Sequence, residues 1–141
     1  SYGKKVVVLG GGLVGCETAC HCAEKADDVT IIEMLPEVLM TVQHSKNNDQ
    51  SLRQLMKDCN VKTITNAKVT EFKDNKVYYE KDGKQEVIEA DTVAIAVGYR
   101  SNTSLYEAIN GKVDCSIVGD AEVPDNILKA VHHGFNSVRC I

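Results

Sequence analysis

Residues 5–15 read KVVVLGGGLVG, and this stretch decides the expected fold. Its first part, residues 5–9, is a continuous β-branched and aliphatic run, which is typical of a strand buried on both faces. Three glycines follow at once, and residues 13–25 have the small and apolar composition of a helix. A second apolar run at residues 29–32 predicts another buried strand. These segments together form one strand–helix–strand unit.

Gly10, Gly12 and Gly15 stand where a dinucleotide fingerprint must stand, after a buried strand and at the opening of a helix. Gly10 permits the tight turn, Gly12 lets the backbone approach a pyrophosphate, and Gly15 lets the helix pack close to the strand. The helix N-terminus offers free N–H groups and a partial positive charge to the phosphates. The pattern predicts a dinucleotide site, and the alternative is a glycine turn without a ligand.

Glu33 ends the second predicted strand, where the fingerprint expects an acidic residue. A carboxylate at this place accepts hydrogen bonds from both hydroxyls of an adenosine ribose and repels a 2′-phosphate. The sequence from Glu33 to Gln43 contains no Arg or Lys that could bind such a phosphate. The expected cofactor is therefore NAD(H) rather than NADP(H).

The next segment predicts a helix and a short strand. Leu52, Leu55, Met56 and Cys59 recur at the spacing of one helical face, and Ser45 is the expected N-cap. Asn60 can end this helix in the left-handed conformation. Residues 61–64 then predict the third strand.

Residues 67–89 have a different character, because charges of both signs are dense and apolar residues alternate with them. Asp74-Asn75 and Asp82-Gly83 lie where hairpin turns are needed. This pattern predicts a three-stranded antiparallel meander with one solvated face. The expected strands are residues 67–72, 76–81 and 85–89.

Residues 92–97 are again continuously apolar and predict a return to the parallel sheet. A short helix at 104–109 and a last buried strand at 115–118 follow. A final helix begins after Pro124, and its expected inner side carries Ile127, Ala130, Val131, Gly134, Phe135 and Val138. The expected fold class is α/β, with a Rossmann-like central parallel sheet and helices.

Composition narrows the classes of partner. The chain has 141 residues, a net charge of −4 and no Trp, so neither nucleic acid nor an anionic membrane is an expected partner. No apolar run reaches the ~18 residues of a membrane span, and a cytoplasmic location is expected. The six cysteines lack the usual spacing of a metal site and are expected to be small buried thiols.

Two stretches of the sequence and one acidic residue resemble a known protein family. Residues 10–17, the strand ending in Glu33, and residues 94–102 resemble the NAD-binding domain of the pyridine nucleotide-disulfide reductase superfamily. Within this superfamily, the sequence of these stretches most resembles the NADH:flavin oxidoreductase/2,4-dienoyl-CoA reductase family, the multidomain relatives of old yellow enzyme. The resemblance implies that the antiparallel meander replaces a crossover helix.

The resemblance also implies site residues. Glu17 matches a carboxylate near the nicotinamide, although a first-turn helical residue is the plainer interpretation. Val97-Gly98 matches a stretch that passes NAD, and Asp120 matches the aspartate that binds the ribityl chain of FAD, with residues 126–128 behind the flavin. No catalytic side chain and no metal site are expected. The expected cofactor-binding residues are Gly10, Gly12, Leu13, Val14, Gly15, Glu17, Glu33, Val97, Gly98 and Asp120.

The resemblance further implies the domain plan and the activity. Residues 1–112 are expected to form the NAD(H)-binding domain, and residues 113–141 the closing segment of an FAD domain packed on it. The first FAD fingerprint and a barrel with FMN and an iron–sulfur cluster are expected in other parts of a longer chain, so the fragment alone is expected to be inactive. The expected reaction passes hydride from NADH to FAD and reduces an activated C=C bond of enoate, dienoyl-CoA or bile-acid type.

Two alternatives stay open. The first is the NAD domain of an NADH oxidase or disulfide reductase, and the second is a non-catalytic NAD-sensing module. The His132-His133 pair supplies no argument for catalysis, because no carboxylate lies at helical spacing from it and a solvated helix face is the expected environment.

Overall fold

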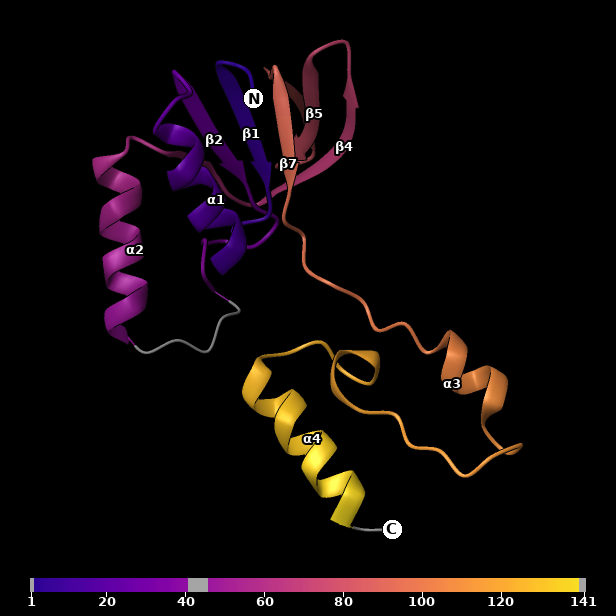
Figure 1. Cartoon of the computed structure of the whole chain (residues 1–141). Helices are drawn as coiled ribbons and strands as arrows, with labels where there is room; N and C mark the ends of the chain where they lie inside the picture. Colours follow the sequence, from indigo (N-terminus) through magenta and orange to yellow (C-terminus); the bar gives the residue numbers. More distant parts are fainter. Residues whose placement is uncertain (1, 41–45, 140–141) are drawn as a thin grey trace. The chain divides into compact units, whose positions relative to one another are not determined.

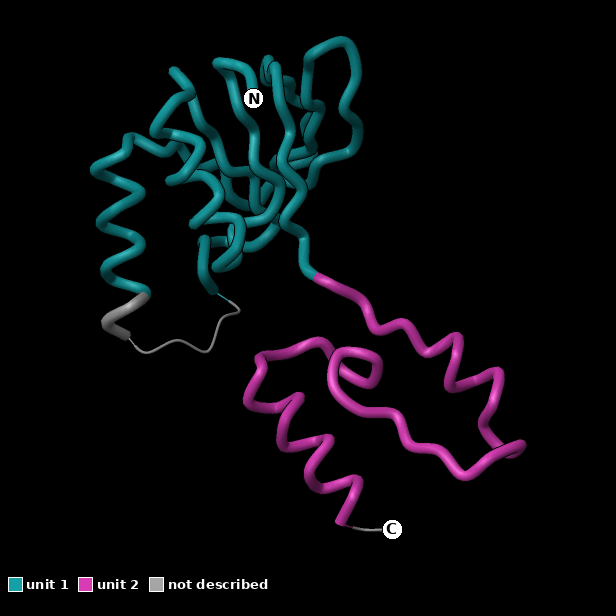
Figure 2. The backbone as a smooth tube through the Cα atoms, viewed as in Figure 1, with its two compact units in different colours: residues 1–98 teal, residues 99–141 magenta. Residues whose placement is uncertain are grey.

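A computed structural model describes residues 2–40 and 46–139. The chain forms two compact units, residues 1–98 and residues 99–141, coloured separately in Figure 2. The boundary between the two units follows Gly98. The predicted N-cap at Ser45 lies outside the described residues.

The first unit is built on a four-stranded parallel sheet in the order β3-β2-β1-β7 (Figure 1). The α/β fold class is therefore confirmed. The strands are β1 (Lys5–Leu9), β2 (Asp28–Ile32), β3 (Lys62–Ile64) and β7 (Thr92–Ile95). The order runs outward from β1 to β3 and then returns to the other side of β1. This reversal between β1 and β7 makes a topological switch point, where α/β sheets bind their ligands.

Different elements pack on the two faces of the parallel sheet. Val6 and Val8 pack with residues of α1 (Leu13–Ala23) and with Met56 of α2 (Lys46–Asp58). Val7 points to the other face and packs against the antiparallel meander, including Val77 and Tyr79. Successive residues of a strand point to opposite faces, so the unbroken apolar run of β1 is needed to fill both cores.

The meander consists of β4 (Ala67–Lys73), β5 (Lys76–Lys81) and β6 (Lys84–Glu89), as predicted. Its two turns have positive φ at all four central residues, which is the left-handed geometry of two-residue hairpin loops. These residues are Asp74, Asn75, Asp82 and Gly83. Asn60 also has a positive φ of 54°, in agreement with its predicted place at the end of α2.

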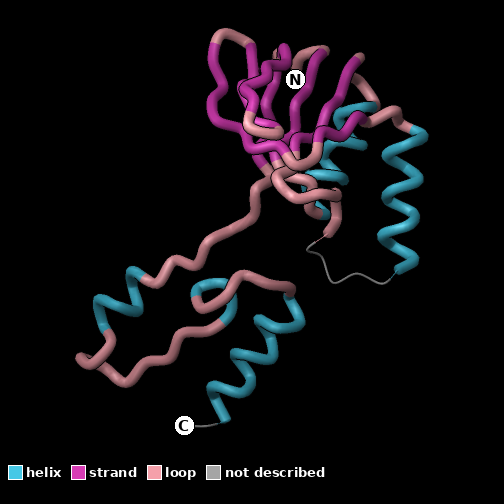
Figure 3. Tube along the Cα trace, turned by 180° about the vertical axis from the view of Figure 1, so that it is seen from behind, coloured by secondary structure: helices cyan, strands magenta, loops and turns pink. Residues whose placement is uncertain are grey.

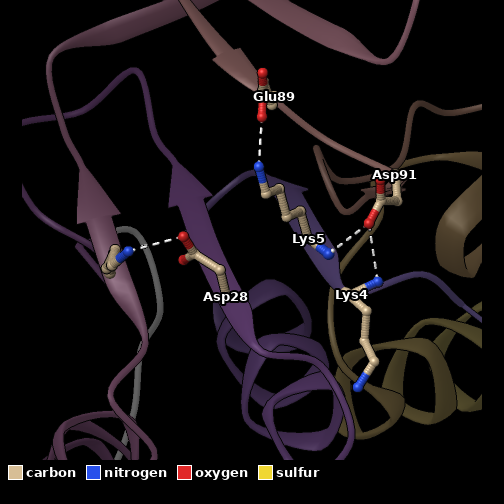
Figure 4. Close-up of polar contacts among 6 residues, drawn as sticks. Lys4, Lys5, Asp28, Glu89 and Asp91 are labelled. Carbon is tan, nitrogen blue, oxygen red and sulfur yellow. Dashed lines mark hydrogen bonds and ion pairs between the residues drawn. The ribbon is translucent and has the colours of Figure 1, made fainter.

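The strands of the first unit begin in a network of charged groups (Figure 4). Oδ2 of Asp91 accepts the backbone N–H groups of Lys4 and Lys5 at 3.0 and 2.9 Å. The Lys5 ammonium also pairs with Glu89, and this partner lowers the pKa of the Glu89 carboxyl. Asp91 thereby fixes the entry of the chain into β1.

Asp91→Ala is expected to lower the free energy of unfolding of the first unit by about 1–2 kcal/mol, because two amides lose a charged acceptor. Urea unfolding followed by circular dichroism measures this effect. Glu71→Ala, at an exposed position of β4, is the matched control and should leave the curve unchanged. Equal curves for the two variants would contradict the assigned role of Asp91.

The second unit contains α3 (Ser104–Ile109), the short 3₁₀-helix η1 (Gly119–Ala121) and α4 (Ile127–Arg139). Figure 3 shows helices and loops there, and the predicted strand at 115–118 is wrong, since these residues have no strand pairing. A strand requires a hydrogen-bonding neighbour, and the described residues supply none for this segment. The expected inner side of α4 is also not buried: Ile127 is 84% exposed and Phe135 is 59% exposed.

The described part of the chain has no helix that is both long enough and apolar enough to span a membrane.

Candidate functional site

The glycine turn between β1 and α1 is held by close backbone contacts. Gly10 has φ +100°, and its N–H donates to the carbonyl of Ile32 at 2.9 Å. A Cβ at Gly10 would lie 2.4 Å from the carbonyl oxygen of Ala96, and a Cβ at Gly15 would lie 2.0 Å from that of Gly10. Gly10 therefore allows the tight turn, and Gly15 allows the close helix–strand packing, both as the sequence predicts.

Gly12 faces open space at the start of α1. A Cβ there would meet nothing within 4 Å, so this glycine is not required for packing within the described structure. No side chain caps α1, and its first turn contains no acidic residue, while Leu13 and Val14 are 37% and 56% exposed. The first amides of a helix lack intrahelical partners and carry the positive end of its dipole. This arrangement fits an anionic pyrophosphate.

Glu33 follows β2 directly and is oriented by the backbone. One carboxylate oxygen accepts the N–H of Gly11 at 2.5 Å, and the other accepts the N–H of Leu35 at 2.9 Å. Each oxygen has two lone pairs, so each keeps the capacity to accept a further donor. The side chain is half-buried and fits a ligand with two adjacent hydroxyl groups.

The loop after β2, residues 34–40, packs on the glycine turn, and the sequence analysis missed this contact. Leu39 is 4% exposed, has φ +61°, and donates its N–H to the carbonyl of Gly11 at 2.6 Å. A Cβ at Gly11 would lie 2.7 Å from Val38 Cγ1 and 3.2 Å from Glu33 Cβ. The fingerprint requires glycine at positions 10 and 12 but not at position 11. The additional glycine was the one sequence feature that could have indicated a close contact at this position.

Cys16 belongs to the same contact. Its Sγ donates to the carbonyl of Gly11 at 3.5 Å, and burial raises the pKa of the thiol to about 12. Burial also raises the pKa of Cys20 and Cys22, which lie on the same helix. These three thiols are buried, as predicted, and they are neutral groups of the core at physiological pH. Cys59 and Cys115 are only partly buried, contrary to the prediction, and Cys140 lies outside the described residues. Within residues 2–40 and 46–139, no three potential ligands form a metal-binding group.

The other predicted residues of the first unit lie around the turn or beyond it. Glu17 is exposed on α1, one turn after the glycines. Val97 is 71% exposed, and its nitrogen lies 3.3 Å from the position of a Cβ on Gly10. Gly98 has φ +88°. The fold therefore brings Val97 beside the glycine turn at the carboxyl ends of β1 and β7.

Asp120 lies in the second unit, within η1, and accepts the N–H of Asp125 at 3.4 Å. In the same unit, Nδ1 of His133 lies 3.2 Å from Oε2 of Glu122, with both side chains partly exposed. No carboxylate lies at helical spacing from the histidine pair, but His133 has Glu122 beside it. The partner comes from the loop before α4, which helical spacing cannot reveal.

Comparison with known proteins identifies the family of this chain. Residues 1–129 match the family model described as pyridine nucleotide-disulphide oxidoreductase. The chain belongs to this family. The family and its relatives bind FAD and NAD(P)H and are flavin-dependent oxidoreductases.

Individual members of the pyridine nucleotide-disulphide oxidoreductase family differ in their reactions. Cinnamate reductase of Clostridium sporogenes is 29% identical over 145 residues, covering 100% of this chain and 22% of that protein. NADH oxidase of Thermoanaerobacter brockii is 36% identical, covering 94% and 20%. The structure of 2-naphthoyl-CoA reductase with 2-naphthoyl-CoA matches with a TM-score of 0.79 and 30% identity, covering 96% and 21%. The chain spans about a fifth of the length of these relatives.

Proposed function

We propose that the chain is the NAD(H)-binding part of a longer flavin-dependent oxidoreductase. The observation that carries the proposal is the oriented carboxylate of Glu33 beside an uncapped helix N-terminus with open space at Gly12. NADH, when bound, supplies the hydride that reduces FAD. In this proposal the protein binds and orients the nucleotide and contributes no catalytic acid, base or nucleophile.

The proposed roles divide the site along the nucleotide. Gly10, Gly12 and Gly15, with the amides of Leu13 and Val14, bind the pyrophosphate, and Glu33 binds the adenosine ribose. Glu17, Val97 and Gly98 lie toward the nicotinamide. Residues 1–112 form the NAD(H) domain in this assignment.

The second unit is assigned to the FAD-binding part, with Asp120 as the residue for the ribityl chain. Residues 113–141 then close an FAD domain whose remainder belongs to the longer chain. Two features support this assignment: the segment 115–118 has no neighbouring strand among the residues that the structure describes, and the apolar side of α4 is exposed. A partner sheet would satisfy both.

The proposed reaction of the whole protein is reduction of an activated C=C bond, with FMN and an iron–sulfur cluster in regions outside this chain. The names of cinnamate reductase and 2-naphthoyl-CoA reductase support a substrate of the enoate or aromatic acyl-CoA type. The second candidate is an NADH oxidase, which the 36% identity to the Thermoanaerobacter brockii enzyme favours. Both candidates use NADH in the same site.

The test is calorimetric titration of the chain with NADH and with NADPH. NADH is expected to bind at least about tenfold more tightly, because the Glu33 carboxylate repels a 2′-phosphate. Equal affinities would contradict the role of Glu33, and absence of binding by either nucleotide would contradict the proposed function.

A further inference from the structure

Arg53 of α2 makes a contact that joins this helix to the loop at residues 34–40. Its Nη2 donates to the carbonyl of Val38 at 2.8 Å, and the guanidinium is about one-third exposed. Its Nε lies 3.2 Å from both carboxylate oxygens of Asp49, one helical turn away. The carboxylate of Glu37 lies 4.0 Å from the guanidinium. Arg53 is therefore held from its own helix while it reaches across to the loop.

The residue after Val38 is the strained part of this loop. Leu39 is a buried non-glycine residue with φ +61°, in the left-handed region that branched and bulky side chains rarely adopt. Such a conformation persists only where the surrounding structure holds it. The peptide group between Val38 and Leu39 is held at both of its polar atoms: its carbonyl accepts from Arg53, and its N–H donates to the carbonyl of Gly11.

Gly11 carries the connection to the candidate site. Its carbonyl accepts the N–H of Leu39, and its N–H donates to the carboxylate of Glu33. Its Cα leaves no room for a side chain between Val38 and Glu33. A shift of the loop at Val38 must therefore move Gly11, Glu33 or both, because these groups are in direct contact.

We infer that Arg53 is a positioning residue of the dinucleotide site. It holds the loop at residues 34–40 in the conformation that sets Gly11 and Glu33 for the nucleotide. The effect on NADH rests on the proposed function, whereas the effect on the loop does not. Its charge is already engaged by Asp49 and the Val38 carbonyl, so its presence is compatible with discrimination against a 2′-phosphate.

Hydrogen exchange of the chain without nucleotide tests the inference directly. Arg53→Ala is expected to increase exchange at the amides of Leu39 and Gly11 by about tenfold, the equivalent of one lost net hydrogen bond. Lys57→Ala removes one positive charge from an exposed site on the same helix and is the matched control. Unchanged protection of Leu39 and Gly11 in Arg53→Ala would overturn the inference.

Calorimetry with NADH then measures the consequence for the site. Arg53→Ala should remain folded, with an unfolding curve shifted to slightly lower urea by the lost hydrogen bond, and should bind NADH about tenfold more weakly. Lys57→Ala should bind NADH as the wild type does. Arg53→Lys keeps a donor that can reach the Val38 carbonyl and is expected to recover part of the affinity. Wild-type affinity in Arg53→Ala would refute the positioning role. If the wild type itself fails to bind NADH, the proposed function fails, and the exchange result alone decides whether Arg53 holds the loop.

Discussion

Gly15→Ala is expected to lower the free energy of unfolding of the first unit by about 3 kcal/mol, the upper part of the range for overpacking. Alanine is favoured over glycine by about 1 kcal/mol within an exposed helix, so propensity alone predicts the opposite sign. The clash decides the outcome, because the new Cβ would lie 2.0 Å from the carbonyl oxygen of Gly10. The carbonyl belongs to the backbone and the methyl group is fixed directly to the Cα of residue 15, so α1 can accept the methyl group only by moving away from β1.

Gly134→Ala provides the control for this prediction. Gly134 lies within α4, and a Cβ there would meet nothing within 4 Å. This variant should leave the unfolding of the first unit unchanged. Urea unfolding followed by circular dichroism compares the two variants with the wild type. A Gly15→Ala protein as stable as Gly134→Ala would show that α1 is not tightly packed against the turn.

Glu33→Ala is expected to weaken NADH binding by about 100-fold, equivalent to about 2.7 kcal/mol and within the range for losing two hydrogen bonds to a charged group. The affinity for NADPH should change much less, because the lost hydrogen bonds are offset by removal of the charge that repels the 2′-phosphate. The difference in affinity between NADH and NADPH therefore becomes smaller. Calorimetric titration of the variant with both nucleotides measures this difference.

The control for Glu33→Ala must remove a carboxylate without touching the turn. Glu24→Ala does so, since Glu24 is exposed at the end of α1 and its carboxylate lies 3.7 Å from the imidazole of His21 rather than near the glycine turn. Unfolding curves of both variants are needed, because Gly11 and Leu35 lose their acceptor in Glu33→Ala. If NADH and NADPH lose affinity equally in a folded Glu33→Ala protein, Glu33 acts on the loop and not on the ribose.

Local chemistry explains why much of the first unit could be predicted. The run at residues 5–9 can only fill two cores, and the observed β1 has the predicted bounds. The Asp74-Asn75 and Asp82-Gly83 pairs accept positive φ and produce both hairpins. These elements depend on residues close together in the chain.

The features that the sequence did not predict depend on contacts between residues that are distant in the chain. The role of Gly11 depends on Val38 and Leu39, and that of Arg53 on a carbonyl fifteen positions earlier in the sequence. No spacing rule links these positions, because they lie in different elements of the fold. The strand expected at 115–118 failed for the same reason: its apolar composition is local, but its hydrogen-bonding partner must come from another strand.

The strand–glycine–helix unit, the acidic residue after β2 and the family to which they point all follow from the amino-acid sequence alone. Their cause is local, since backbone conformation and apolar spacing are properties of short segments. The folded molecule was needed to show which glycine faces open space, which glycines are enclosed by packing, and which side chains hold the turn in place. Whether a position has room for a side chain depends on atoms from other segments of the chain. Gly12 and Gly15 are the same amino acid, but only Gly15 lies against the backbone of the turn.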